Sequence, residues 1–208
     1  MKSTANNTHQ GTQVFIPCLT IGNVGQLCAD LLINTFSLPE SSHLQDDALL
    51  PYVAPPVYDH IQTPTTAMSL YSDEKLSVFQ IRSTVVQSLF KNFCDDLANY
   101  VQKMAPSHVF LLHSNSKGNL GEVFLSQETV LEKSPIASYF YKKLSEKGLK
   151  VSIINSVCYD GDTRNDALKM FKTVLEILKE EVPLKEVKSW NTSTLWGDLK
   201  AETQAAMF

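Results

Sequence analysis

The sequence predicts an α/β protein of one domain, with a central, mainly parallel sheet flanked by helices, one antiparallel hairpin and an extended C-terminal tail. Two observations lead to this prediction. Short apolar runs typical of buried strands alternate with segments whose apolar residues repeat at three- and four-residue steps, as on one face of a helix. In addition, a length of 208 residues with 43% hydrophobic content suits one substantial core.

The first regular elements are expected directly after a polar N-terminal arm. Residues 1–12 are polar and show no periodicity, so we expect a frayed arm there. Residues 14–17 (VFIP) are typical of a short buried strand, and the turn Gly22–Gly25 leads into a helix with apolar residues at Leu27 and Leu31. The folded part of the chain therefore begins with a strand, a tight turn and a helix.

The next part of the sequence is expected to form a loop followed by the hairpin. Residues 39–64 are rich in Pro, Ser, Asp and Thr, so we expect a loop that holds at most one small strand. Two extended apolar segments follow at 67–71 and 76–81, and a short polar turn joins them. These two segments are the predicted antiparallel pair.

The second half of the chain shows the alternation of helices and strands. Apolar residues from Leu89 to Met104 predict a helix that Pro106 ends. The uniformly apolar run at 109–112 predicts a central strand covered on both faces. A polar, glycine-containing loop is expected at 114–129, and then a helix that begins at Ser134 and ends at Gly148.

One more strand and one more helix complete the predicted domain. Residues 151–157 (VSIINSV) predict the strand, and an apolar helical stripe runs from Ala167 to Leu178. Val182-Pro183 is expected to stop this helix, because proline cannot continue it. The predicted division is an arm at 1–12, an α/β domain at 13–182 and a C-terminal tail at 183–208.

The composition excludes several classes of partner. The formal net charge is −4 and the 18 basic residues are scattered, so the sequence shows no basic patch suited to a phosphate backbone. No apolar run approaches the roughly 20 residues that cross a membrane, and residues 1–7 lack the apolar core of a signal peptide. We expect a protein of the cytoplasm, with the nucleus as an alternative, that binds neither nucleic acid nor membrane. The cysteines are interpreted as small, reduced core residues: Cys18, Cys28, Cys94 and Cys158.

An enzyme is the competing functional class. The Gly22–Gly25 loop lies between a first strand and a helix N-terminus, where a phosphate-binding loop would lie, but it lacks the glycine pattern of nucleotide-binding motifs. His113 and Ser114 follow a predicted central strand, at the end where α/β sheets bind ligands. The alternative is a small-molecule hydrolase or phosphorylase using the Gly22–Gly25 loop and His113. The same residues also have an explanation without catalysis. Close packing of the strand on the helix explains the Gly22–Gly25 loop, and a polar strand end explains His113 and Ser114.

No metal or cofactor site is expected. The histidines are dispersed: His9, His43, His60, His108 and His113. Because His108 and His113 bracket one strand, they point to opposite faces and do not share a ligand. The acidic residues around Gly161 lack the spacing of a calcium loop and are interpreted as turn and cap, with Asp162 or Thr163 capping the last helix.

The C-terminus carries the candidate binding site. Ala206, Met207 and Phe208 place apolar side chains directly beside the terminal carboxylate and outside the predicted core. A pocket that offers an apolar slot, with a lysine or backbone amides for the carboxylate, would capture such an end. We expect these three residues to contact a partner, and the alternative is a tail folded back on the domain.

Several stretches resemble the proteasome assembly chaperone 2 family. The most specific is Thr20–Leu27 (TIGNVGQL), which matches the stretch that leads into the family's first helix. The other matching stretches are Gln80–Ser83, Phe93–Leu97, Gly161-Asp162, Asp166–Leu168, Ser189-Trp190, Trp196-Gly197 and the final Phe208. The resemblance extends over most of the chain, from Val14 to Phe208.

The resemblance implies a chaperone and not an enzyme. It implies pairing with a related subunit, proteasome assembly chaperone 1, and binding to the outer face of the α-subunit ring of the immature core particle. There the pair would favour correct ring assembly and block premature docking of activators. Any contacts that larger relatives make through longer insertions do not carry over, because the region 116–131 is compact in this sequence.

The resemblance also implies a role for the last three residues. The family inserts C-terminal tails into pockets between α subunits, commonly through a hydrophobic-tyrosine-any ending. By position, Ala206 is the hydrophobic residue, Met207 stands where tyrosine is expected, and the carboxylate of Phe208 would meet a pocket lysine. Because the tyrosine is missing, we expect this tail to be the weaker of the two anchors in the heterodimer.

Overall fold

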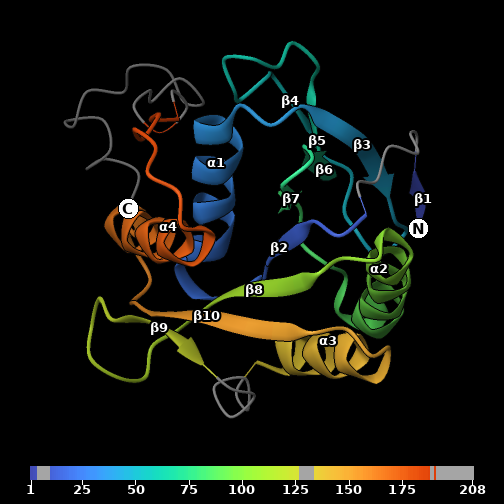
Figure 1. Cartoon of the computed structure of the whole chain (residues 1–208). Helices are drawn as coiled ribbons and strands as arrows, with labels where there is room; N and C mark the ends of the chain where they lie inside the picture. Colours follow the sequence, from blue (N-terminus) through green and yellow to red (C-terminus); the bar gives the residue numbers. More distant parts are fainter. Residues whose placement is uncertain (4–9, 127–133, 188–189, 191–208) are drawn as a thin grey trace, which may run out of the picture.

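An eight-stranded sheet organises the protein. The computed structural model describes residues 1–3, 10–126, 134–187 and 190 of the chain. The strands lie in the order β1-β3-β6-β7-β2-β8-β10-β9 (Figure 1). Their bounds are β1 Lys2–Ser3, β2 Gln13–Pro17, β3 Glu40–Gln45, β6 Met68–Ser72, β7 Leu76–Ile81, β8 His108–Asn115, β9 Val123–Ser126 and β10 Val151–Val157. Two short strands, β4 Val53–Ala54 and β5 Thr65–Thr66, pair separately.

The centre of the sheet is parallel and its two sides are antiparallel. Strands β7, β2, β8 and β10 run parallel, and Val14 of β2 pairs with Ser77 on one side and with Val109 on the other. The predicted hairpin is confirmed, because β6 pairs antiparallel with β7 in the register Met68 to Ile81. Strand β3 extends this antiparallel side, and β9 closes the opposite edge against β10.

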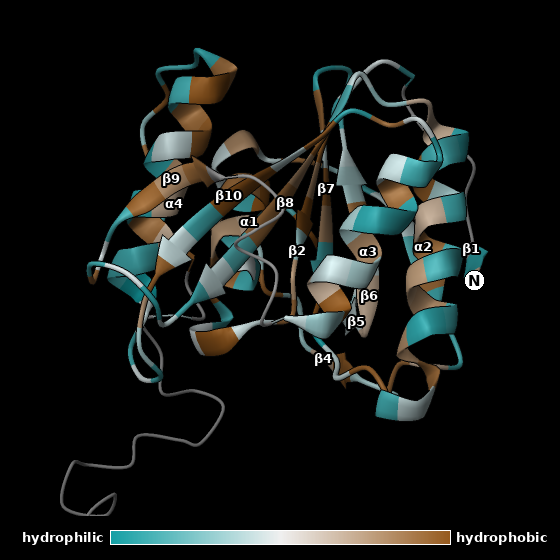
Figure 2. Cartoon of the chain, turned by 90° about the horizontal axis from the view of Figure 1, so that it is seen from below, coloured by the Kyte–Doolittle hydropathy of each residue, from teal (hydrophilic) through white to brown (hydrophobic). Residues whose placement is uncertain are grey.

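Helices cover both faces of the sheet, so the α/β prediction is confirmed. Helices α1 (Val24–Phe36) and α4 (Arg164–Leu178) pack on one face, and α2 (Phe90–Met104) and α3 (Pro135–Glu146) pack on the other. Two single-turn helices precede α1 and α2: η1 Ile21–Asn23 and η2 Gln87–Leu89. In Figure 2 the hydrophobic colour is concentrated on the central strands between these helical layers.

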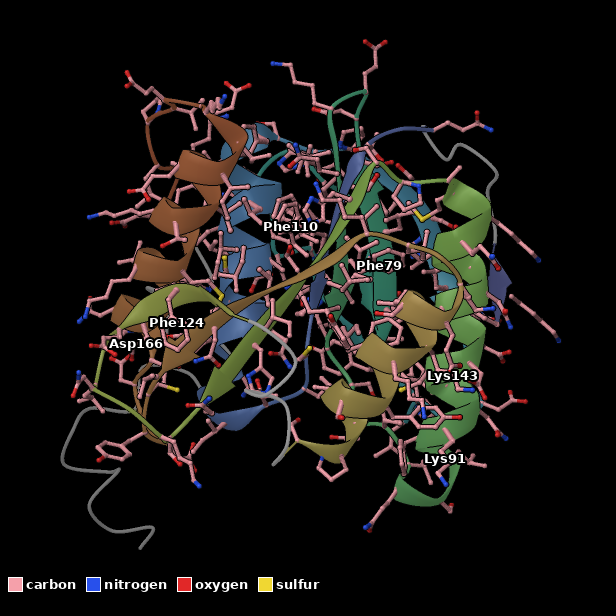
Figure 3. The ribbon with its side chains drawn as sticks, turned by 60° about the horizontal axis from the view of Figure 1, so that its bottom comes forward. Phe79, Lys91, Phe110, Phe124, Lys143 and Asp166 are labelled. Carbon is pink, nitrogen blue, oxygen red and sulfur yellow. The ribbon has the colours of Figure 1, made fainter. Side chains whose placement is uncertain are left out.

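Alternate residues of the strands fill two separate cores. In β8, Val109 and Leu111 face α2 and α3, whereas Phe110 and Leu112 face α1 and α4. Figure 3 shows Phe110 and Phe79 in the interior, Lys91 near the start of α2, and Lys143 of α3 beside α2, where its Nζ lies 3.6 Å from Asp95 Oδ1. A strand buried on both faces needs no polar alternation, which is why the uniformly apolar run at 109–112 was correctly predicted as central.

Two segments predicted as loops contain edge strands. The region 39–64 was expected to hold at most one small strand, and it contains β3 and the two-residue β4. The region 114–129 was expected to be loop only, which is wrong, because β9 lies within it. Strand β3 (ESSHLQ) is mostly polar, so it lacks the apolar run of a core strand. Strand β9 (VFLS) is apolar but only four residues long and follows a polar, glycine-containing stretch, so it was not recognised as a strand.

The described parts of the two predicted terminal segments pack on the domain. Strand β1 pairs with β3, and Thr12 is buried, with its hydroxyl oxygen 3.1 Å from Oγ of Ser77. Helix α4 ends at Leu178, so it stops before the predicted break at Val182-Pro183. Residues 181–187 form neither helix nor strand. They lie along α1, where Asn34 Nδ2 donates hydrogen bonds to the carbonyl oxygens of Lys185 (3.2 Å) and Glu186 (2.8 Å).

Candidate functional site

A polar hollow lies at the carboxyl ends of β2 and β7. The chain leaving β2 turns to α1 on one face of the sheet, and the chain leaving β7 turns to α2 on the other face. Ligand crevices of open α/β sheets form where neighbouring connections diverge in this way. The hollow has a volume of about 510 Å³ and is lined by residues from 19–30 and 81–84 together with Tyr52. It therefore brings together the two stretches 20–27 and 80–83 that carry the family resemblance.

A buried carboxylate on α1 is the centre of this site. Asp30 is 3% exposed, and its Oδ1 accepts hydrogen bonds from Tyr58 Oη at 2.6 Å and from Gln80 Nε2 at 2.7 Å. Arg82 Nη2 forms an ion pair with the same oxygen and donates to Tyr58 Oη at 2.9 Å. The Gln80 amide also donates to the carbonyl oxygen of Gln26, at 2.8 Å. This cluster joins α1, β7 and the proline-rich segment 51–64.

The electrostatics keep the cluster in one protonation state at neutral pH. Burial, followed by the nearby Asp30 carboxylate, raises the pKa of Tyr58, so its hydroxyl stays a neutral donor. Burial is the largest single influence on Arg82 and lowers its pKa, but the Asp30 carboxylate, Tyr58 and Tyr71 together raise the pKa by more, so the guanidinium stays charged. A charged guanidinium and a neutral phenol hydrogen-bonded to a buried carboxylate suit a structural role.

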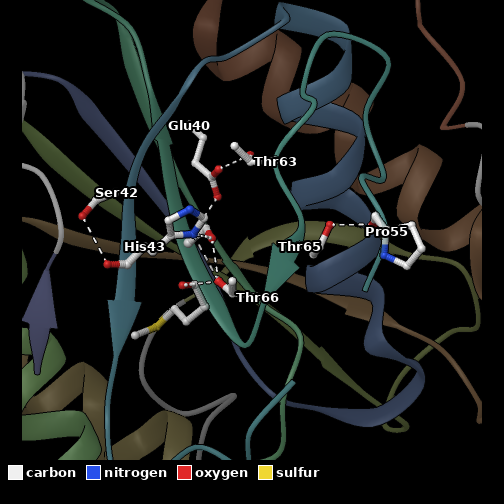
Figure 4. A network of polar contacts seen from close by, with 9 residues as sticks. Glu40, Ser42, His43, Pro55, Thr63, Thr65 and Thr66 are labelled. Atoms are coloured by element: carbon white, nitrogen blue, oxygen red, sulfur yellow. Dashed lines mark hydrogen bonds and ion pairs between the residues drawn. The ribbon is translucent and has the colours of Figure 1, made fainter. Parts of the chain in front are cut away.

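The segment that supplies Tyr58 is held on its other side by polar contacts. Figure 4 shows the group: Thr63 Oγ1 donates to Glu40 Oε2 at 2.7 Å, and His43 Nδ1 lies 3.2 Å from Glu40 Oε1. Thr65 Oγ1 donates to the carbonyl oxygen of Pro55 at 3.1 Å, next to the β4–β5 pair. The proline-rich segment thus has a fixed path over the sheet edge, although its sequence predicted little regular structure.

The glycine turn is explained by close packing. Gly22 has φ 68°, and a Cβ there would lie 2.5 Å from Cγ2 of Thr163, whose hydroxyl donates to the Gly22 carbonyl oxygen. A Cβ on Gly25 would lie 2.6 Å from the carbonyl oxygen of Leu112. The start of α4 and strand β8 therefore occupy the space around this turn. This geometry favours the structural interpretation of the Gly22–Gly25 loop over a phosphate site.

His113 and Ser114 lie on opposite faces of β8. Nδ1 of His113 is 2.8 Å from Oδ1 of Asn155, and burial lowers the pKa of His113 while this hydrogen bond partly opposes the shift. Ser114 Oγ donates to the carbonyl oxygen of Ile21 at 2.6 Å and lies 2.8 Å from Thr20 Oγ1. The structure therefore places Ser114 beside the glycine turn and His113 away from it. The nucleophile and base of the alternative enzyme are not brought together.

His108 and His60 have structural partners, and His60 Nε2 lies 2.8 Å from the carbonyl oxygen of Leu38. His108 Nε2 lies 2.8 Å from Ser152 Oγ and its ring stacks on Phe110, so His108 and His113 do point to opposite faces as predicted. Within the described ranges no group of three or more His, Cys, Asp or Glu side chains is placed to hold a metal ion. His9 lies outside these residues.

The start of α4 differs in one detail from the prediction. Thr163 is the N-cap residue, but its hydroxyl bonds to the glycine turn and not to its own helix. Asp162 Oδ1 instead accepts from the Arg164 main-chain N–H at 3.2 Å. Hydrogen bonds from the Arg164 side chain lower the pKa of Asp162 to about 2. Of the two predicted capping residues, Asp162 therefore accepts the hydrogen bond from the start of α4, whereas Thr163 links α4 to the turn before α1.

The cysteine prediction is confirmed. All four cysteines are free and buried. Burial raises the pKa of Cys18 to about 12 and, together with the smaller effect of Asp95, the pKa of Cys94 to about 12. They are thiols at neutral pH and serve as small core residues.

The central residues of the site, Asp30 and Tyr58, were not predicted from the sequence. Asp30 is a carboxylate within an otherwise apolar stretch of α1, which is the signal that a buried partner must exist. Nothing in the local pattern identifies Tyr58 as one of its partners. The predicted binding residues Ala206, Met207 and Phe208 lie outside the described residues.

Comparisons with known proteins agree on one family. A sequence model described as the PAC2 family matches residues 14–186. The protein is 24% identical to proteasome assembly chaperone 2 of Xenopus laevis over 88% of this chain and 89% of that protein. It is 29% identical to proteasome assembly chaperone 2 of Homo sapiens, but that match spans 50% of this chain and 42% of the human protein.

Solved structures show the same fold. Pyrococcus furiosus PbaA, an archaeal homolog of proteasome-assembly chaperone, superposes with a TM-score of 0.70 at 15% identity, over 88% of this chain and 87% of PbaA. Pyrococcus furiosus PbaB, an archaeal proteasome activator, gives 0.64 at 14% identity, over 88% and 90% of the two chains. No helix in the described part of the chain is both long and apolar enough to span a membrane. By its match over residues 14–186, the chain belongs to the PAC2 family, which confirms the resemblance found in its sequence.

Proposed function

We propose that this protein is a non-catalytic proteasome assembly chaperone. In this proposal it pairs with a proteasome assembly chaperone 1-like subunit and binds the α-ring of the immature core particle. The pair promotes correct ring assembly and blocks premature docking of activators, in the cytoplasm or the nucleus. The observation that carries the proposal is the similarity to proteasome assembly chaperone 2 of Xenopus laevis along 88% of the chain.

The geometry of the site supports a protein that works by binding a partner and not by catalysis. The resemblance-bearing residues fix the path of the chain through the Asp30–Arg82 ion pair. The residues of the alternative hydrolase or phosphorylase are either packed, as at Gly22, or separated by the sheet, as are His113 and Ser114. A protein that works by binding needs a surface of fixed shape, and buried polar clusters of this kind supply it.

We further propose that the domain at 13–182 carries the fold and that Ala206, Met207 and Phe208 form the contact with a pocket of the α-ring. An apolar side chain next to a free carboxylate is the pattern that terminus-binding pockets recognise. Met207 lacks the hydroxyl of tyrosine, so the contact forgoes one hydrogen bond, worth about 1 kcal/mol net.

Two tail variants test this proposal with opposite expected effects. Removal of residues 206–208 should weaken binding to recombinant α-ring while leaving the unfolding midpoint and pairing with the partner subunit unchanged. The variant Met207→Tyr should tighten binding by about fivefold, the equivalent of one such hydrogen bond. Affinities are measured by interferometry on immobilised α-ring. Equal affinity of the full-length and truncated proteins would remove the tail from the mechanism.

A further inference from the structure

Part of the proline-rich segment forms a loop, residues 55–64, that side chains hold in place. Strands β4 and β5 pair at its two ends, and between them the loop contains neither helix nor strand. Tyr58 Oη donates to Asp30 Oδ1 at 2.6 Å. Nε2 of His60 lies 2.8 Å from the carbonyl oxygen of Leu38. The path of the loop therefore depends on contacts with α1 and with the chain that follows α1.

Thr63 attaches the far end of this loop to the sheet. Its Oγ1 donates a hydrogen bond to Glu40 Oε2 at 2.7 Å (Figure 4). Glu40 begins β3, and its side chain is 9% exposed. The other oxygen of this carboxyl group lies 3.2 Å from Nδ1 of His43. A charge added at Thr63 would therefore act directly on an acidic group that water screens poorly.

Thr63 is accessible to a modifying enzyme. Gln62, Thr63 and Pro64 are all exposed, in a stretch without regular structure. An exposed, irregular stretch is the form in which a protein kinase accepts a substrate, and a threonine followed by proline is the dipeptide that proline-directed kinases require. The chain holds one other dipeptide of this kind, Ser134-Pro135, but it forms the start of helix α3.

We propose that Thr63 is a phosphorylation site for a proline-directed protein kinase, and that the phosphate releases the loop 55–64 from the sheet. The kinase transfers the γ-phosphoryl group of ATP to Oγ1. The bond between this phosphorus and the oxygen of ADP breaks, the new bond joins the phosphorus to Oγ1, and the hydroxyl proton passes to a base of the kinase. This regulation goes beyond the proposed function and does not depend on it.

The phosphate would turn an attraction at this attachment into a repulsion. The unmodified Oγ1 of Thr63 donates its hydrogen to Glu40, whereas the phosphorylated oxygen has no hydrogen to donate and carries a group with a charge of about −1.5 to −2. Glu40 cannot easily move away, because it is part of β3 and pairs with Tyr71 of β6. The irregular loop is therefore the side that yields.

Release of the loop would reach the polar hollow at the carboxyl ends of β2 and β7. Tyr58 belongs to the same loop, is 3% exposed and donates to Asp30, which lines that hollow. Arg82 Nη2 donates to the same Tyr58 hydroxyl at 2.9 Å. A loop freed at Thr63 moves Tyr58 away from both partners, so the ion pair of Asp30 and Arg82 becomes accessible to water. Modification of an exposed residue thereby changes the shape of the site.

The first test is incubation of the full, folded chain with ATP and a purified cyclin-dependent kinase, followed by mass spectrometry of its peptides. Phosphate is expected on Thr63. The variants Thr63→Val and Pro64→Ala should each abolish this modification, because one lacks the hydroxyl and the other lacks the proline that the kinase requires. Phosphate on Ser134 alone, or on neither residue, would overturn the proposal.

The second test asks whether the phosphate opens the loop. The reporter is the main-chain N–H of Ile61, which donates to the carbonyl oxygen of Tyr58 at 3.2 Å within the loop. Its hydrogen exchange, followed by NMR, should be about tenfold faster in the phosphorylated protein, the factor expected for the loss of one hydrogen bond to a charged group. The control is the N–H of Val109, bonded to Lys150 in the sheet region, whose exchange should not change. Unchanged exchange at Ile61 would contradict release of the loop.

A pair of variants separates the added charge from the lost hydrogen bond. Thr63→Glu adds a negative charge, whereas Thr63→Val only removes the donor. The melting temperature of Thr63→Glu should be about 2–4 °C below that of Thr63→Val, and this difference should disappear when Glu40→Gln removes the opposing charge. A difference that persists with Glu40→Gln would assign the effect to the size of the side chain and refute the repulsion on which the release depends.

Discussion

Replacing Arg82 with methionine should destabilise the protein strongly, because it leaves the Asp30 carboxylate buried without its counter-charge. Asp30 is 3% exposed and the Arg82 side chain is 16% exposed, so neither group is well screened by water. Removing one member of a buried ion pair costs about 3–5 kcal/mol. Tyr58 and Gln80 still donate to the carboxylate, which places the expected loss at the lower end, about 3 kcal/mol.

Urea unfolding followed by circular dichroism measures this loss. For a chain of this size about 3 kcal/mol corresponds to a fall of about 6–12 °C in the melting temperature. The companion variant Asp30→Asn and the double variant complete a cycle, and the double variant should be less destabilised than the sum of the single variants. The matched control is Arg164→Met, since Arg164 and Asp162 form an exposed pair whose loss should leave the midpoint unchanged.

The cycle can refute the reasoning directly. Additive effects of the two single variants would show that Asp30 and Arg82 do not stabilise one another. A loss in Arg82→Met no larger than in Arg164→Met would show that burial does not strengthen the pair. Either result would contradict our explanation of the Gln80–Ser83 stretch, namely that Arg82 stabilises the fold through its buried ion pair with Asp30.

Three further predictions concern the glycine turn and the buried histidine. Gly25→Ala should lower the free energy of unfolding by about 1–3 kcal/mol, because the added Cβ would lie 2.6 Å from the Leu112 carbonyl oxygen; urea unfolding with no loss would contradict this packing. Thr163→Val should cost about 1 kcal/mol by the same measurement, because the Gly22 carbonyl loses its donor, and an unchanged midpoint would argue against the contact. Stability should fall as the pH drops below the ordinary histidine pKa of 6.5, because the lowered pKa of His113 means that the unfolded chain binds the proton more readily than the folded one. His113→Gln cannot be protonated and should show a smaller fall between about pH 7 and about pH 5; equal slopes would assign the effect to other groups.

The fold was predictable where burial determines the sequence. The strands at 14–17 and 109–112 are apolar because both of their faces are covered, and the strand at 151–157 has Ile153 and Ile154 in the two cores although three of its residues are polar. Such apolar runs can be recognised in a single sequence. Strands β3 and β9 were harder to recognise. Strand β3, which is covered by β1 towards one edge of the sheet, has the mostly polar sequence ESSHLQ. Strand β9 at the other edge is apolar, but its four residues (VFLS) are too few to stand out from the polar loop around them.

The site was only partly predictable, for a different reason. The glycines of the site can be recognised in the sequence, because the tight turn between a strand and a helix requires them at Gly22 and Gly25. The partners of Asp30 lie 28 and 52 positions away along the chain, at Tyr58 and Arg82. No local pattern encodes such a pairing, since it depends on how β7 and the proline-rich segment meet α1 in three dimensions.

The resemblance-bearing stretches make physical sense as one connected support. Gly25 brings α1 against β8, which fixes the height of Asp30 above the sheet. Asp30 then holds Arg82 and, through it, the chain beyond β7. Ser83, the next residue, holds the carbonyl of Leu50. These residues therefore act together in this chain: each one positions the next, and Ser83 positions Leu50, whose side chain is 52% exposed.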